Sequence, residues 1–225
     1  MKKYLPVLKK CCLFQHLNDE EIVHALTCLD AKVIHRNKDA YILNAGSSPD
    51  SVGLLLSGSA LIVQDDLWGN RNVVAKLTEG SLYAEPFAVI PDAVMNMSVA
   101  AIEDCEILLL PASKIFHVCQ NACPHHNLLI QNFVEALSGK LLLLNDKITH
   151  VSKRRTRDKL LSYLSAESIR QNSLSFSIPY NRQQLADFLN VERAAMSVEL
   201  SRLQKEGYLK TKQSYFELNI EHLSL

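Results

Sequence analysis

The feature that most constrains this chain is a run of seven apolar residues separated by alternating gaps of four and three. They are Ile130, Val134, Leu137, Leu141, Leu144, Ile148 and Val151. This spacing repeats the a and d positions of a heptad, which predicts one long helix with a single apolar seam. The seam fits either a coiled coil with a second copy of the chain or packing on the chain's own domain. We predict the dimer seam, in a helix over residues 124–151 that begins at Pro124.

The segment before this helix has a different pattern. After short N-terminal helices, apolar runs alternate with glycine- and serine-containing turns, a pattern typical of an all-β sandwich or barrel. The runs cover residues 32–35, 41–43, 52–56, 60–64, 72–77, 97–101 and 106–110. We therefore predict a β-domain followed by a long helix.

The segment after the long helix predicts two short helices joined by a tight turn. Asn181 can cap a first helix, and Asn190 can take the left-handed conformation that ends it. A second helix is expected over residues 192–206, and Ala186 is small where the two would cross. Residues 208–212 and 214–218 then alternate like a β-hairpin. This order predicts a winged helix-turn-helix, whose second helix enters the DNA major groove.

Charge is distributed unevenly along a chain whose formal net charge is zero. Residues 1–150 hold 12 basic and 16 acidic side chains, whereas residues 151–225 hold 12 and 8. An excess of basic residues at one end is typical of a nucleic-acid-binding domain. The cluster at 153–159 is placed to meet phosphates, although it could equally be the solvated start of a helix.

Composition excludes several classes of protein. A hydrophobic fraction of 48% with low net charge argues against a disordered chain. No apolar run is long enough to cross a membrane, and the N-terminus lacks the apolar segment of a signal peptide. Six cysteines in 225 residues are too few for a disulfide scaffold, so we expect a cytoplasmic protein. No catalytic motif was found, so we expect no enzyme.

In this order of elements the chain resembles the Crp/Fnr family of bacterial transcription regulators. Gly46 and Gly58 stand at the spacing of the family's turn glycines, and residues 80–85 lie where the family has its G-x-x-x-G-E phosphate cassette. The resemblance implies an α+β protein with a cyclic-nucleotide-binding-like β-barrel (jelly roll), a long dimerisation helix and a C-terminal winged helix-turn-helix. The expected domains are residues 1–123, 124–151 and 152–225. A Cys-x-x-x-Cys before the long helix is similar to that of Firmicutes-type members.

The sequence departs from the family in its effector domain. Members that bind cAMP place an Arg-Ser pair about ten residues after the cassette glutamate, but Met97-Ser98 stands here. A buried phosphate needs a cation, and residues 77–113 contain no Arg or Lys. We therefore predict an effector other than cAMP, or only packed side chains, in place of the nucleotide. The candidate pocket residues are Leu82, Glu85, Phe87, Met97, Leu137 and Leu141.

The recognition helix also departs from the family. Arg193 matches the family's first arginine and can bond guanine through both ends of its guanidinium. Ala194 and Val198 replace the usual Glu and second Arg, which indicates an unusual operator, richer in A·T. The predicted DNA-binding residues are Arg182, Gln183, Glu192, Arg193, Ala194, Ser197, Val198 and Arg202; for Arg202, contact with phosphate or solvent is favoured.

One cluster of soft ligands precedes the long helix. Cys119 and Cys123 are separated by three residues, and Cys123 adjoins the predicted helix start, where the helix dipole lowers a thiol pKa. They are redox candidates, with two structural thiols as the alternative. The pattern is not a recognised zinc signature, so no metal site is predicted, and the spacing for a 4Fe–4S cluster is absent.

Together these features predict a homodimeric, sequence-specific transcription regulator of double-stranded DNA, controlled by an effector other than cAMP. RNA polymerase is a further candidate partner, and a membrane is not. The alternative is a redox- or ligand-sensing module whose winged helix mediates protein contacts. The effector, the operator and genes, the sign of regulation and the role of the two cysteines are not encoded in any motif we identify.

Overall fold

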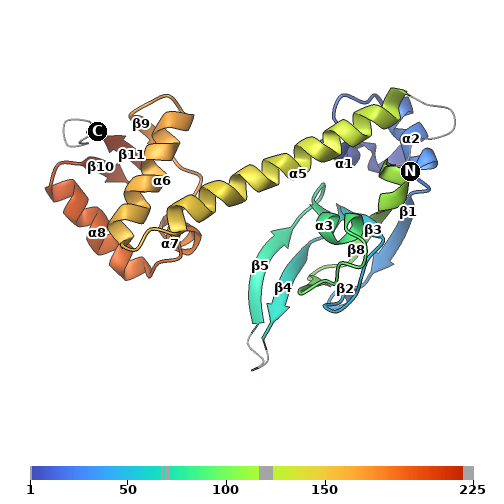
Figure 1. Cartoon of the computed structure of the whole chain (residues 1–225), viewed down its shortest axis with the longest axis horizontal. Coiled ribbons are helices and arrows are strands. Elements are labelled where there is room, and N and C mark those ends of the chain that lie inside the picture. The colour runs from blue at the N-terminus through green and yellow to red at the C-terminus, as the bar shows by residue number, and fades with distance from the viewer. Residues whose placement is uncertain (1, 67, 69–70, 117–123, 220–225) are drawn as a thin grey trace. The chain divides into compact units, whose positions relative to one another are not determined.

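The computed structural model describes residues 2–66, 68, 71–116 and 124–219 (Figure 1). Its contacts divide the chain into two units, Met1–Leu137 and Ser138–Leu225. The boundary falls inside α5 (Pro124–Val151), the long helix that the heptad spacing predicts. The N-terminal β-domain, the long helix and the C-terminal helix-turn-helix with its wing follow one another as predicted.

The first unit starts with short helical segments. They are η1 (Lys2–Tyr4), α1 (Leu5–Leu8), η2 (Cys12–Phe14) and α2 (Asp19–Cys28). A capping box starts α2, because the Asn18 side chain accepts the Glu21 N–H and the Glu21 carboxylate accepts the Asn18 N–H. Three acidic residues in its first turn also favour the helix electrostatically.

The β-domain is a jelly roll of two separate four-stranded sheets, not a closed barrel. One sheet has the order β1-β8-β3-β6 and the other β2-β7-β4-β5, and every pairing is antiparallel. The strands of the first are β1 (Lys32–Arg36), β8 (Cys105–Pro111), β3 (Ser51–Ser57) and β6 (Leu82–Tyr83). Those of the second are β2 (Tyr41–Leu43), β7 (Ser98–Ala101), β4 (Ala60–Asp65) and β5 (Arg71–Leu77). Two short helices, α3 (Glu85–Val89) and α4 (Ala112–Phe116), complete the unit.

Strand β3 of the first sheet is buried on both faces. On β3, Leu54 packs in a core with the N-terminal helices, whereas Leu55 packs in a second core shared with the other sheet. Neighbouring residues of a strand point to opposite faces, so a strand between two cores needs a continuous apolar run. This explains why residues 52–56 are all buried and do not alternate.

The first half of α5 packs on its own domain mainly through residues outside the predicted seam, although the seam residue Leu137 packs against the same core. Leu129 and Phe133 are almost fully buried in the core of the N-terminal helices. The buried Asn132 amide donates to the carbonyl oxygens of Leu13, at 3.0 Å, and Gln15, at 2.8 Å. At 100° per residue, the mean direction of the seam positions in this half lies about 110° away from that of Leu129, Asn132 and Phe133. The two interpretations of the heptad therefore concern different faces of the same helix.

The second half of α5 is exposed along almost its whole length in the single chain. Residues 138–149 are all exposed, and among them Leu141, Leu144 and Ile148 have exposed fractions of 67%, 58% and 61%. In the first half, the seam residue Val134 is 50% exposed, whereas Ile130 and Leu137 are half-buried. The last seam residue, Val151, is also half-buried. The seam is thus a largely solvent-facing apolar stripe.

The second unit holds the helix-turn-helix and its sheet around one core. Its elements after α5 are α6 (Thr156–Arg170), β9 (Ser175–Ser177), α7 (Arg182–Leu189), α8 (Arg193–Lys205), β10 (Leu209–Lys212) and β11 (Tyr215–Leu218). The three strands form an antiparallel sheet in the order β10-β11-β9. The core includes Leu164 from α6, Leu185 from α7 and Leu203 from α8. The wing hairpin is therefore fixed to the domain by a third strand.

Candidate DNA interface and effector domain

The turn between α7 and α8 forms for local reasons that the sequence contains. Asn181 and Gln184 make a capping box, with both hydrogen bonds 2.9 Å long. Asn190 ends α7 with φ of 50°, in the left-handed region that asparagine tolerates better than most residues. Ala186 is fully buried where α7 meets the core. The predicted cap and turn are confirmed, whereas a close helix crossing at Ala186 stays a prediction.

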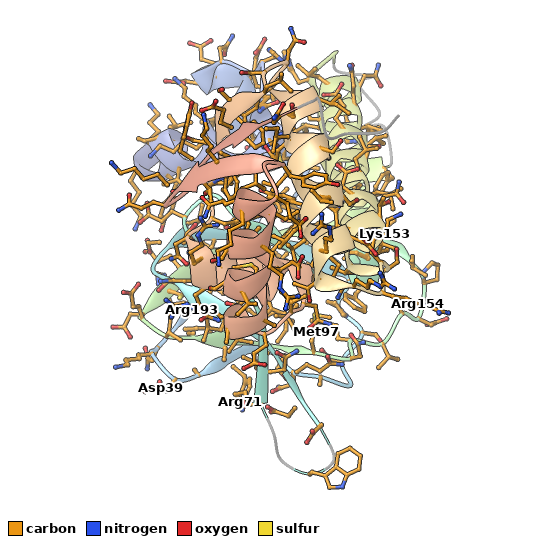
Figure 2. All side chains as sticks on the ribbon, turned by 90° about the vertical axis from the view of Figure 1, so that its left-hand side faces the viewer. Asp39, Arg71, Met97, Lys153, Arg154 and Arg193 are labelled. Atoms are coloured by element: carbon orange, nitrogen blue, oxygen red, sulfur yellow. The ribbon has the colours of Figure 1, made fainter. Side chains whose placement is uncertain are left out.

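The start of α8 presents one face to the core and another to solvent. Met196, Leu200 and Leu203 are buried. The predicted DNA-contacting residues in the first turns of this helix are all exposed: Arg193, Ala194, Ser197 and Val198. Figure 2 shows Arg193 at one end of the helix. Glu192 is exposed at the N-cap position, and its side chain makes no capping hydrogen bond. The structure thus gathers the predicted base-reading residues on one open surface.

Two other predicted contacts are engaged within the domain. Arg182 is half-buried, donates to the Thr211 hydroxyl at 2.7 Å and lies over the Phe216 ring at 5.1 Å. Burial lowers the pKa of its guanidinium from the usual value. Arg202 is exposed and lies 3.7 Å from the Glu199 carboxylate. Arg182 therefore ties α7 to the wing.

Gln183 remains on the exposed surface of α7. Its side-chain amide donates to the Asp187 carboxylate at 2.8 Å, one helical turn further along. This contact leaves the side chain on the same helix face and does not bring it to another element.

The basic cluster at 153–159 has two members whose structural role sequence reasoning missed. Lys159 donates to the carbonyl oxygens of Leu189, at 3.2 Å, and Asn190, at 3.1 Å, where α7 ends. A cation at a helix C-terminus satisfies carbonyls that have no intrahelical partner. Lys159 therefore stabilises the turn of the helix-turn-helix.

Arg157 is the second such residue. Its guanidinium lies 2.6 Å from the Glu206 carboxylate and 3.4 Å from that of Glu199, and 4.8 Å from the centre of the Tyr208 ring. The hydrogen bond with Glu206 raises the pKa of Arg157. Lys153 and Arg154, labelled in Figure 2, and the adjacent Arg155 are exposed. The cations that bind within the domain differ from the exposed ones by partners that lie about 30 to 50 residues away in the sequence, which no local motif records.

The structure does not bring the predicted effector-pocket residues together. Leu82 and Leu137 pack with the core of the N-terminal helices, whereas Phe87 and Met97 pack against the core between the two sheets. Glu85 is buried at the start of α3. Leu141 is 67% exposed and belongs to the second unit. Within the first unit, the predicted pocket residues are therefore divided between two cores.

A tyrosine fills part of the interior between the sheets. The Tyr83 ring lies so close to Gly53 that a Cβ on that glycine would stand 2.0 Å from its Cζ atom. Tyr83 is 2% exposed, and burial raises the pKa of its hydroxyl. Ser98, at the position of the family's phosphate-binding serine, already accepts the Ala45 N–H at 2.9 Å. Packed side chains thus occupy this part of the jelly roll.

The redox candidates Cys119 and Cys123 lie outside the described residues. The described cysteines, Cys11, Cys12, Cys28 and Cys105, form no disulfide. Within the described part of the chain, no three His, Cys, Asp or Glu residues come together as a group that could hold a metal ion. Across the same residues, no helix has the length and hydrophobicity needed to span a membrane.

Comparison with known protein families gives two matches in tandem. Residues 33–122 match the cyclic nucleotide-binding domain, and residues 158–224 match the Crp-like helix-turn-helix domain. A curated relative is the rice (Oryza sativa subsp. japonica) potassium channel AKT2, which is 24% identical over 132 residues. That match covers 59% of this chain and 15% of the channel.

Solved structures share the fold at low sequence identity. The Thermus thermophilus catabolite activator protein is 22% identical, with a TM-score of 0.50, over 94% of this chain and 95% of that one. The Xanthomonas campestris regulator CLP is 16% identical, with a TM-score of 0.53, over 89% and 99%. A cyclic nucleotide-binding domain from Methylobacillus flagellatus is 18% identical, with a TM-score of 0.54, over 66% and 82%.

These matches and the described site define a class of protein in which an effector-binding jelly roll precedes a DNA-binding helix-turn-helix. The chain belongs to the Crp/Fnr family of transcription regulators. Membership sets the general role of each domain, but the effector and the oligomeric state require arguments from this chain's own residues.

The contact of Lys159 with the end of α7 gives a first prediction. Replacing Lys159 by Met keeps the apolar stem but removes the charged donor from two carbonyl oxygens. We expect the free energy of unfolding of the helix-turn-helix unit to fall by about 1 kcal/mol. Urea unfolding followed by far-UV circular dichroism measures this loss. Lys153→Met is the matched control at an exposed position, and an equal effect in both variants would contradict the capping role.

Proposed function

We propose that this protein is a homodimeric, sequence-specific regulator that binds double-stranded DNA through α8 and responds to an effector other than cAMP. Its role is binding and signalling, with no enzymatic reaction. The observation that carries the proposal is the exposed face at the start of α8. It places Arg193 beside small side chains on a helix that follows a well-formed helix-turn-helix turn.

The chemistry of this face fits the major groove. An arginine can donate two hydrogen bonds to the O6 and N7 atoms of guanine. Ala194 and Val198 are apolar and exposed, as suits contact with the methyl group of thymine. Lys153, Arg154 and Arg155 are exposed cations that can approach phosphates, which position a protein on DNA without reading its sequence. RNA polymerase remains a candidate partner of the bound regulator.

The dimer proposal rests on the seam of α5. A soluble monomer rarely exposes a continuous apolar stripe of this kind, and Leu141, Leu144 and Ile148 are each more than half exposed. Their heptad spacing matches the knobs-into-holes packing of a two-stranded coiled coil. A second copy of the same helix would bury this stripe and would bring two recognition helices to a two-fold symmetric operator.

The effector proposal rests on the missing cation. The cyclic phosphate of cAMP carries a charge whose burial needs a paired cation, and residues 77–113 contain no Arg or Lys. In addition, Tyr83 occupies the space over Gly53. The Xanthomonas regulator CLP is c-di-GMP responsive, but a cyclic dinucleotide would meet the same lack of Arg and Lys over residues 77–113 of this chain. An effector without a phosphate fits this interior better.

DNA binding is tested by the salt dependence of affinity and by Arg193. With a fluorescent duplex from the upstream region of the chain's own gene, anisotropy is expected to show affinity falling steeply with salt, because phosphate contacts release counterions. Arg193→Ala should weaken binding about 10- to 100-fold through loss of a guanine contact. Arg170→Gln, a change in the same unit at an arginine paired with Glu167, should leave affinity unchanged. Salt-insensitive binding, or equal effects of both variants, would favour the protein-contact alternative.

The seam is tested by a charge placed within it. Ile148→Glu would bury a carboxylate in a coiled-coil interface, so we expect the dimer to dissociate at micromolar concentration. Leu142→Glu is the matched control, since Leu142 is similarly exposed at 65% but lies outside the heptad positions. Sedimentation equilibrium separates the two cases. A dimer that survives Ile148→Glu and dissociates with Leu142→Glu would place the interface on another face of α5.

The effector class is tested with cAMP and adenosine as a matched pair, which differ by the cyclic phosphate. Titration calorimetry is expected to give no saturable cAMP binding up to about 1 mM, an affinity limit of about −4 kcal/mol. If cAMP bound at micromolar concentration while adenosine did not, the interior would recognise phosphate and the proposal would be wrong.

A further inference from the structure

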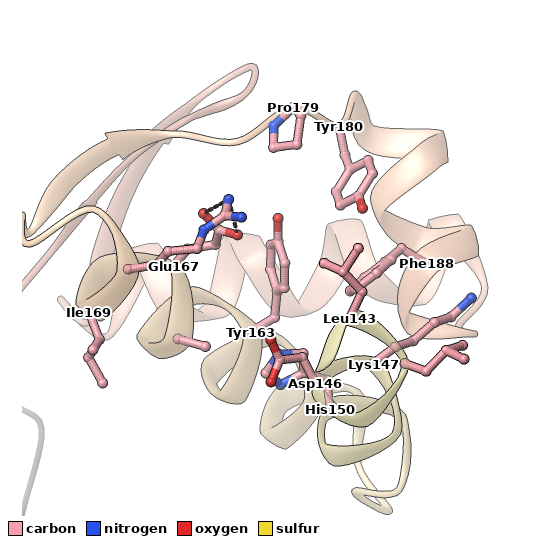
Figure 3. Close-up of a pocket in the computed structure, with 13 residues that line it drawn as sticks. Leu143, Asp146, Lys147, His150, Tyr163, Glu167, Ile169, Pro179, Tyr180 and Phe188 are labelled. Atoms are coloured by element: carbon pink, nitrogen blue, oxygen red, sulfur yellow. Dashed lines mark hydrogen bonds and ion pairs between the residues drawn. The ribbon is translucent and has the colours of Figure 1, made fainter. Parts of the chain in front are cut away.

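The second unit contains a cavity that no part of the proposed function uses. Its volume is about 590 Å³, within the range of small-molecule sites. Side chains of α5, α6, α7 and the segment before α7 form its walls (Figure 3). The lining residues are Leu143, Leu144, Asp146, Lys147, His150, Tyr163, Ala166, Glu167, Ile169, Arg170, Pro179, Tyr180 and Phe188.

Three aromatic rings form one side of the cavity. Tyr180 and Phe188 are stacked, with ring centres 5.0 Å apart and an angle of 26° between their planes. The Tyr163 ring centre lies 5.3 Å from that of Phe188 and 6.2 Å from that of Tyr180. Leu143 lines the cavity from α5. Aromatic rings next to an aliphatic side chain favour a planar apolar ligand. Such a ligand can pack on the rings in an offset-stacked or edge-to-face arrangement.

The Tyr163 hydroxyl gives the cavity a polar anchor. Tyr163 is 3% exposed, and its hydroxyl is buried with no hydrogen-bond partner in the described part of the chain. Figure 3 shows the ring extending between Glu167 and Tyr180, with the hydroxyl pointing into the space between them. A buried hydroxyl without a partner costs free energy, which a ligand acceptor would recover. Burial also raises the pKa of Tyr163, so the hydroxyl stays protonated as a donor.

The remaining polar groups in the cavity have partners or offset each other. The Glu167 carboxylate accepts from Arg170, at 2.8 Å, and from Gln171, at 2.9 Å. The His150 ring is bonded to the Ser162 hydroxyl at 2.8 Å. Burial lowers the pKa of His150, which favours its neutral form. Asp146 and Lys147 carry opposite charges that offset each other, so these two residues do not favour a charged ligand.

The cavity and the dimer seam use different faces of α5. Leu143, Lys147 and His150 follow one another at gaps of four and three residues, and so lie on one side of the helix. At 100° per residue, this side is about 130° away from the seam residues. Leu144 is a seam residue that also lines the cavity at its edge. A coiled coil formed through the seam would therefore leave most of the cavity lining on another side of the helix.

We propose that this cavity is a binding site for an uncharged, planar aromatic molecule that carries a hydrogen-bond acceptor for the Tyr163 hydroxyl. The ligand stacks against the aromatic side and contacts α5, α6 and α7 together. The site is separate from the jelly-roll interior, and its occupancy does not depend on whether the protein binds DNA or dimerises.

The test uses two planar probes of similar size. Quinolin-2(1H)-one has a carbonyl acceptor, and naphthalene has none. Saturation-transfer NMR with the full chain is expected to show both binding, with quinolinone more tightly held. Tyr163→Phe keeps the ring but removes the donor, and should weaken quinolinone binding about three- to tenfold while leaving naphthalene binding unchanged.

A second variant closes the cavity itself. Ala166→Trp places a large ring in the space and should abolish binding of both probes, whereas Ser165→Trp, one position along α6 and outside the lining, should not. Absence of binding to the wild-type chain, or equal binding to wild type and Ala166→Trp, would overturn the proposal. A change of oligomeric state with Ala166→Trp in sedimentation would also overturn it, since a protein segment would then be the occupant. These readouts need no DNA, so they remain distinct from the test of DNA binding.

Discussion

One helix, α5, must satisfy surfaces in both units with a single set of side chains, and its 3.6-residue repeat limits which residues each surface can use. In the first half, Leu129 and Phe133 pack on the β-domain while Asn132 bonds backbone carbonyls of the N-terminal helices. In the second half, His150 is bonded to Ser162 of α6. Rotation of the helix would break buried contacts at both ends. The direction in which the apolar seam faces is therefore set largely by contacts of residues outside the seam, although Leu137 also packs on the β-domain.

The elements that could be predicted from the sequence are those determined by the spacing of residues close together in the chain. The heptad gaps located α5, and Asn181 and Asn190 located the first helix and the turn of the helix-turn-helix, because each acts within a few residues. Strand β6 was missed, since Leu82–Tyr83 is a strand through its pairing with Gly53 and Leu54, about 30 residues earlier. The double burial of β3 likewise depends on a second sheet and a helical layer that no local pattern describes.

The candidate site was harder to predict, because the sequence position of a charged residue does not show which group its side chain binds. Arg182 and Lys159 look alike in sequence to cations that face DNA, but the structure uses one to hold the wing and the other to hold the end of α7. Their partners are about 30 residues away in each case. Ala194 and Val198 differ, because their helix positions relative to the buried Met196 and Leu200 already place them on the outer face. Arg193 is exposed as the first residue of α8. Helical periodicity thus identifies exposed positions, while internal cations require tertiary structure.

In the effector domain, packed side chains occupy part of the interior in which an effector would bind. Tyr83 against Gly53 leaves no space for an added atom at that point, so an effector bound there would have to displace the ring. Tyr83 ends strand β6, and Glu85 starts α3 two residues later. An effector shifts an equilibrium only if it binds two states unequally, so an effector at this point would have to favour a state in which the ring is displaced. The tight packing that argues against cAMP is then also the element that a different ligand would act on.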